Sequence, residues 1–172
     1  MNVPFACSII YGGVLGGWIY IEGEGLNFRT GKVTVEERIR NLKLPYEEIK
    51  DITWKTVLFP VATVSLKNGE DYRFLIFNKR RFEKNRLRVL RIREMEEILN
   101  RANALLSDPV TNRQALSDLQ PRIEKLTEYY TGDLWKEDFA ADEAGKLPKD
   151  LKRGVLSEDA VHDMLTLMSQ NF

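Results

Sequence analysis

The stretch GGVLGGWIYIEGEGLNF, residues 12–28, contains six of the chain's 11 glycines. Glycines at this density are typical either of a loop that wraps a nucleotide phosphate or of tight turns between neighbouring strands. A phosphate loop leaves a strand and opens a helix, whose N-terminal amides bind the phosphate, and a P-loop also ends in Gly-Lys-Ser/Thr. GGVLGG is followed instead by WIYIE, a β-branched and aromatic run typical of a strand. The glycines therefore indicate turns in an antiparallel meander.

The same alternation of short strands and turns continues to residue 77. Further strands are predicted at LNFRT (26–30), RIRNLKLP (38–45), ITWKTVLF (52–59), VATVSLK (61–67) and EDYRFLIF (70–77). Asn68-Gly69 between the last two is a strong two-residue hairpin signal, in which both turn residues need positive φ. Asn78 is a good N-cap for a following helix, with Phe77 and Phe82 spaced as a hydrophobic staple.

From about residue 88 the apolar period changes from two to three and a half, which predicts helices. The first stripe consists of Ile92, Met95, Leu99, Ala102 and Leu106, and the second of Leu116, Leu119, Ile123, Leu126 and Tyr130. The short SDPVTN link (107–112) makes the two helices antiparallel neighbours, and Pro121 marks a kink or a restart in the second. We interpret both stripes as bundle core rather than as a groove for a partner. Ser157 is a predicted cap of a last helix.

The predicted fold class is therefore α+β. About seven antiparallel strands followed by a helix is the order of a pleckstrin-homology-like β-barrel, here over residues 1–87, capped by that helix. A small all-α helical-hairpin domain over residues 88–172 follows it.

Residues 1–87 resemble the GRAM family of the pleckstrin-homology-like fold. The resemblance is carried by GGWIYI, GLNFRT, LPYEEIKDI, LFPVATVSL and NGEDYRFLIF, with the basic and aromatic RRF behind them. It implies a binding module, often for membranes or proteins, without catalytic residues.

The second half resembles a small bacterial helical family that is known only as a domain of unknown function. RIREMEEILNRA, LQPRIEKLTEYY and, above all, GKLPKDLKRGVLSED (145–159) carry this resemblance, which covers about residues 88–168. It implies a helical fold and a bacterial origin, and it implies no activity.

Composition narrows the function classes. The 172 residues have a formal net charge of zero, yet residues 1–87 hold 14 Lys and Arg against 10 Asp and Glu, and residues 88–172 hold 12 against 16. The two opposite charges cancel, so the chain has no overall positive electrostatic field that would attract nucleic acid. Residues 1–21 carry no charge, but Pro4 and glycines interrupt them, so we predict two buried strands there rather than a membrane span.

Candidates for chemistry are few. Cys7 is the only cysteine and His162 the only histidine, so the chain can form no internal disulfide and no zinc site of the usual type. We predict a buried thiol at Cys7, a solvent-facing His162 and a cytoplasmic location. An acidic helix lacks a strong metal-ligand pattern, and we interpret it as a solvated or Arg-pairing face formed by Asp133, Glu137, Asp138, Asp142 and Glu143.

The most distinctive stretch is KRRFEKNRLRVLRIR, residues 79–93, called the basic stretch below. It contains one acid, Glu83, and eight cations: Lys79, Arg80, Arg81, Lys84, Arg86, Arg88, Arg91 and Arg93. These cations could bind an anionic membrane, nucleic-acid phosphates, a protein partner or the acidic helix of the second half. Lipid-binding relatives of the barrel commonly carry cations between the first two strands, where this chain has the uncharged YGGVLGG, and this weakens the lipid interpretation.

We therefore expect a non-catalytic binding or adaptor module of the bacterial cytoplasm that acts through protein–protein interaction. The first alternative is a peripheral membrane module that binds anionic lipid through the basic stretch. The second is an enzyme of unknown type, for which the sequence offers no catalytic constellation. We expect a protein partner and allow an anionic lipid or a homo-oligomer, and we do not expect nucleic acid, a metal or a cofactor.

Overall fold

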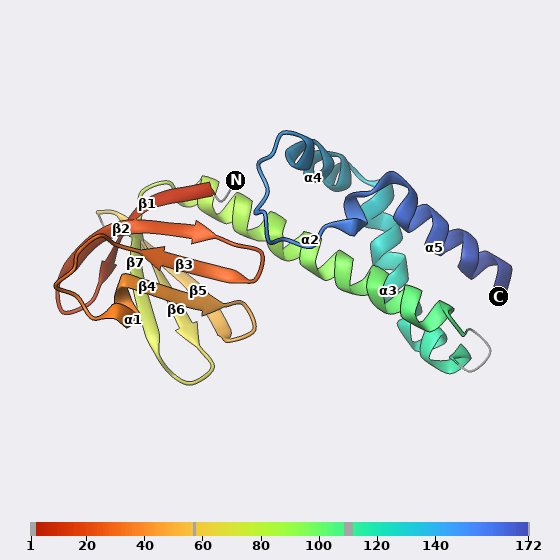
Figure 1. Cartoon of the computed structure of the whole chain (residues 1–172), viewed down its shortest axis with the longest axis horizontal. Coiled ribbons are helices and arrows are strands. Elements are labelled where there is room, and N and C mark those ends of the chain that lie inside the picture. The colour runs from red at the N-terminus through yellow and green to blue at the C-terminus, as the bar shows by residue number, and fades with distance from the viewer. Residues whose placement is uncertain (1–2, 57, 109–111, 172) are drawn as a thin grey trace. The chain divides into compact units, whose positions relative to one another are not determined.

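The computed structural model describes residues 3–56, 58–108 and 112–171. The chain divides into two compact units (Figure 1). The β unit comprises Met1–Val89 together with Leu147–Leu151, and the helical unit comprises Leu90–Lys146 together with Lys152–Phe172. Among the described helices, none combines the length and apolar character needed to cross a membrane.

The β unit is built on one seven-stranded antiparallel sheet in the order β4-β3-β2-β1-β7-β6-β5. Its strands are β1 (Val3–Ile10), β2 (Val14–Ile21), β3 (Gly25–Arg29), β4 (Asn41–Pro45), β5 (Ile49–Thr56), β6 (Pro60–Leu66) and β7 (Asp71–Ile76). The sheet curls into a half-barrel (Figure 1). The predicted α+β class, with about seven antiparallel strands followed by helices, is confirmed. The strands do not form a single meander, because β1 pairs with β7 and leaves the consecutive strands β4 and β5 at the two edges.

Alternate residues of the strands point into the half-barrel and form its core. Ile9, Ile19 and Phe28 are fully buried, and the Phe28 and Phe74 rings lie 5.7 Å apart. In β2, β6 and β7 this burial follows the period-two pattern of a sheet with one solvated face.

The glycines of the opening stretch have two roles. Gly12 and Gly13, with φ of 59° and 158°, form the β1–β2 turn, as predicted. Gly16 and Gly17 lie inside β2 instead of in that turn. A Cβ on Gly17 would lie 2.7 Å from atoms of the Phe28 ring, so this strand position needs a residue without a side chain.

Three local predictions are wrong. Only the second half of RIRNLKLP is a strand, because α1 (Glu37–Arg40) precedes β4. Asn68 does not have the positive φ that a two-residue turn requires, whereas Gly69 has a φ of 92°. The Gly69 amide donates to the Leu66 carbonyl at 3.1 Å, so the β6–β7 hairpin is closed by a three-residue loop. Phe77 makes no staple, because its exposed ring contacts Phe59, whereas Phe82 packs inside against Phe5 and Trp54.

The helical unit contains most of α2 (Lys79–Leu106) and α3 (Arg113–Thr131), α4 (Asp133–Glu143), the 3-10 helix η1 (Gly154–Leu156) and α5 (Glu158–Asn171). Glu97 pairs with Arg122 and Glu94 with Lys125, so α2 and α3 run antiparallel, as predicted. Pro121 lies inside a continuous α3 and is not a restart.

Two C-terminal features complete the fold. Ser157 has the extended backbone of an N-cap, but its hydroxyl makes no hydrogen bond with the described residues, so the predicted cap bond is missing. Leu147–Leu151 belongs to the β unit, where the Gly23 amide donates to Asp150 Oδ2 at 2.9 Å. A Cβ on Gly23 would lie 2.8 Å from the Leu151 backbone, so this contact depends on glycine.

Candidate functional site

The basic stretch begins α2, and its first cations lie against aromatic rings. Asn78 caps the helix as predicted, since its Oδ1 accepts a hydrogen bond from the Arg81 amide at 3.1 Å. Cations in a first turn are disfavoured by the helix dipole. Lys79 Nζ lies 5.0 Å from the centre of the Trp54 ring and Arg81 Cζ lies 5.6 Å from that of Phe5, and such cation–π contacts offset this cost.

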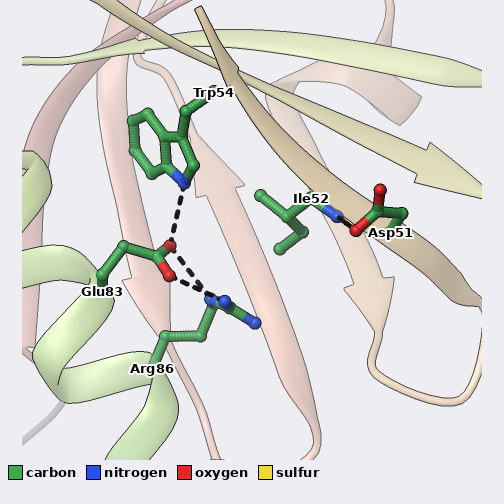
Figure 2. A network of polar contacts seen from close by, with 5 residues as sticks. All are labelled: Asp51, Ile52, Trp54, Glu83 and Arg86. Atoms are coloured by element: carbon green, nitrogen blue, oxygen red, sulfur yellow. Dashed lines mark hydrogen bonds and ion pairs between the residues drawn. The ribbon is translucent and has the colours of Figure 1, made fainter.

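The single acid of the basic stretch joins α2 to strand β5 (Figure 2). Trp54 Nε1 donates to Glu83 Oε1 at 3.2 Å, and Arg86 donates to both carboxylate oxygens at 3.1 and 2.7 Å. Asp51, also drawn in Figure 2, instead accepts the Ile52 amide at 2.7 Å. Glu83 and Arg86 are therefore engaged inside the β unit.

Arg91 makes an ion pair with a fully buried carboxylate. Its Nε and one terminal nitrogen donate to Asp138 at 2.9 and 2.7 Å, and the Tyr129 hydroxyl donates to the same carboxylate at 3.0 Å. Asp138 is 0% exposed. Burial and then the charge of Asp138 raise the pKa of Tyr129, and the hydrogen bonds and charge of Asp138 outweigh burial and raise the pKa of Arg91.

The remaining cations of the basic stretch do not gather into one site. Arg80 is exposed, while Lys84, Arg88 and Arg93 also have interaction partners. With Arg86 and Arg91 in ion pairs, and Lys79 and Arg81 over rings, the stretch is not a free cationic face.

The other candidate residues are placed as follows. The acidic helix was interpreted as a solvated or Arg-pairing face, and some of its acids do pair with cations. Asp142 lies 3.0 Å from Arg153, and Asp133 lies 3.2 Å from Lys136. Among the described residues, no group of three or more His, Cys, Asp and Glu could hold a metal ion. Cys7 is buried and His162 exposed, as predicted, and burial raises the pKa of the Cys7 thiol to about 12.

A groove between α3 and α5 is a candidate binding feature of the helical unit. Its volume is about 860 Å³. Its lining combines apolar side chains with hydroxyls, an amide and two carboxylates: Leu116, Ser117, Gln120, Ile123, Glu124, Thr127, Glu128, Thr131, Leu165, Met168 and Ser169. An apolar groove with a few polar groups is the usual form of a site for a ligand or a helical segment.

Helix α3 separates its charges between its two sides. Arg122 and Lys125 pair with Glu97 and Glu94 of α2. Glu124 and Glu128, one turn apart, line the groove, and they are the charged residues among the described lining. The groove therefore carries net negative charge.

The sequence analysis missed this groove because it assigned the whole apolar stripe of α3 to the bundle core. Leu116 and Ile123 are indeed buried, yet both also line the groove. The available signal was Glu124 and Glu128 beside that stripe, at a spacing of four.

An exposed apolar tip lies where the β5–β6 connection meets the β7–α2 junction. Leu58, Phe59 and Phe77 are 86%, 53% and 62% exposed, and the two rings lie 6.1 Å apart. The first cations of α2 follow directly in the chain. The sequence analysis placed Phe59 in a strand and Phe77 in a staple, so it missed this tip as well.

Comparison with known proteins identifies the helical half. Residues 92–171 match the family model described as "Domain of unknown function (DUF4298)". The match includes every described residue that lines the α3–α5 groove, so the groove lies within the matched segment, which is called the DUF4298 domain below.

Two further comparisons add no function to the DUF4298 domain. No curated protein matches the chain. A solved structure, the C-terminal domain of an unknown protein from Leishmania infantum, is 17% identical, with a TM-score of 0.41 over 48% of this chain and 75% of that one.

Proposed function

We propose that the chain is a non-catalytic protein-binding module of the bacterial cytoplasm. In this proposal the DUF4298 domain receives the partner in its α3–α5 groove, and the half-barrel is a GRAM-like scaffold. The observation that carries the proposal is the groove itself, because its volume of about 860 Å³ and its mixed lining suit insertion of several side chains.

The engagement of the basic stretch supports a protein partner over a membrane bound by that stretch. Arg86 and Arg91 are held by Glu83 and Asp138, so moving them to a lipid surface would break hydrogen bonds at 2.7 Å. Charge-assisted bonds of this length are the strong ones. The cations of the stretch are thus better explained as structural.

A matched pair of variants on α5 tests the groove. Leu165→Glu places a charge in the lining, whereas Thr166→Glu adds the same charge at an exposed neighbour outside it. A partner captured from lysate is identified, purified and titrated by calorimetry. We expect Leu165→Glu to weaken binding at least tenfold and Thr166→Glu to change it less than twofold. Equal affinity for both variants would contradict the proposal.

A second candidate function rests on the apolar tip. Leu58, Phe59 and Phe77 could insert into a bilayer beside the first cations of α2, which favour anionic headgroups. Co-sedimentation with phosphatidylserine vesicles at low salt tests it, with Leu58→Asp against the exposed Val33→Asp as control. Loss of vesicle binding in Leu58→Asp alone would support membrane docking, and absence of binding by the unmodified protein would remove it.

A further inference from the structure

The shape of the α3–α5 groove favours a helical occupant. On α3 its lining runs from Leu116 to Thr131, which at 1.5 Å per residue corresponds to about 22 Å, or four helical turns. On the other side α5 contributes Leu165, Met168 and Ser169. A groove that follows one helix for four turns, with a second helix beside part of that length, accepts another helix, which would contact it through side chains at i, i+3 or i+4, i+7 and i+11.

The apolar lining requires an apolar stripe on the occupant. Leu165 and Met168 from α5 supply accessible apolar surface, whereas Leu116 and Ile123 from α3 are buried and form its base. Leu165 and Met168 are only half-buried, so an occupant would complete their burial. Methionine adapts its side chain to different neighbours, which suits a surface that repacks on binding.

The charge of the groove requires cations on the occupant. Glu124 and Glu128 lie one turn apart on α3. Gln120 Nε2 donates to Glu124 Oε1 at 3.5 Å, and neither carboxylate makes an ion pair with the described residues. The nearby cations of α3, Arg122 and Lys125, are paired with α2 instead. Two carboxylates beside an apolar surface attract a helix with Lys or Arg spaced four residues apart and repel an acidic one.

We infer that the occupant of the groove is a basic amphipathic helix of a partner protein, and this inference rests on the proposed function. Its apolar stripe packs on Leu165 and Met168 over the buried Leu116 and Ile123, and its cations flank Glu124 and Glu128. The carboxylates select the sign of the partner's charge, and the apolar lining supplies most of the buried area.

A charge-swap selection tests this inference. A displayed library of 18-residue amphipathic helices, with Lys/Arg, Glu/Asp or Gln/Ser on the polar face, is selected against the full chain. The same library is selected against Glu124→Lys/Glu128→Lys. The matched control is Glu143→Lys/Asp163→Lys, which makes the same charge change at exposed residues outside the groove. Circular dichroism verifies that each variant is folded.

We expect basic helices to be enriched on the unmodified chain and acidic ones on the groove-reversed variant. Fluorescence anisotropy should show a selected basic peptide losing about tenfold in affinity on groove reversal, and less than twofold in the control. Equal binding of neutral or acidic helices, with binding still lost in Leu165→Glu, would overturn the basic partner and leave the groove as a binding site. Failure to select any helix sensitive to Leu165→Glu would overturn both proposals.

Discussion

Replacing Asp138 with Asn should strongly destabilise the helical unit. The carboxylate is 0% exposed and accepts two hydrogen bonds from Arg91 and one from Tyr129. Asparagine keeps the shape but removes the negative charge, so the guanidinium of Arg91 loses its counter-ion in a partly buried place. The loss of charge, rather than of volume, is therefore the perturbation.

The expected magnitude follows from the burial of the pair. Removing one partner of a buried ion pair costs about 3–5 kcal/mol. The Arg91 side chain is 23% exposed and can recover some hydration, so we expect the lower end, about 3 kcal/mol. At about 4–8 °C per kcal/mol for a domain the size of the helical unit, the melting temperature should fall by roughly 12–24 °C.

The assay is urea and thermal unfolding followed by circular dichroism at 222 nm. Asp133→Asn is the matched control, because it lies on the same helix and pairs with Lys136 at 3.2 Å in an exposed position. Exposed pairs contribute about 0–1 kcal/mol, so this variant should unfold almost as the unmodified protein does. Equal, small effects of the two substitutions would refute the reasoning about the buried pair.

Three further predictions concern the β unit. Gly23→Ala should lower the free energy of unfolding by about 1–3 kcal/mol, because the new Cβ would lie 2.8 Å from the Leu151 backbone. Gly16→Ala is the control, because its Cβ would have no atom within 4 Å, and similar urea midpoints for the two variants would contradict this prediction. Glu83→Gln should cost about 1 kcal/mol by removing the charge that holds Arg86, and an unchanged midpoint would remove this pair from the account. Burial raises the pKa of the Cys7 thiol from its usual 9.0 to about 12. Above pH 9 the thiol ionises in the unfolded chain but stays neutral in the folded one, so the free energy of unfolding should fall as the pH rises from 9 towards 12. In Cys7→Ala the urea midpoint should fall less between pH 9 and 11, and an identical fall would contradict the assignment.

The strands were predictable because their burial is local in sequence. The period-two patterns of β2, β6 and β7, and the glycine turn at residues 12–13, follow from neighbouring residues alone. The RIRNLKLP prediction failed where the period changes, since Ile39, Leu42 and Leu44 are all buried at spacings of three and then two. The first spacing crosses from α1 into β4 and the second lies within β4, so one strand pattern could not describe both.

The candidate site was less predictable because its contacts are distant in sequence. Trp54 reaches Glu83 across 29 positions and Arg91 reaches Asp138 across 47, and no spacing rule anticipates such pairs. The general idea that the acidic helix pairs with arginine was available from charge, but the choice of Arg91 was not. The groove needed α5 beside α3, which only the tertiary structure provides.

Mapping a selected basic helix onto the isotopically labelled chain by NMR tests the central claim most directly. Amide shift changes should concentrate at groove residues such as Gln120, Glu124 and Met168, and they should disappear in Leu165→Glu. Changes concentrated at residues 79–93, or on the β unit, with the groove amides unmoved, would contradict it.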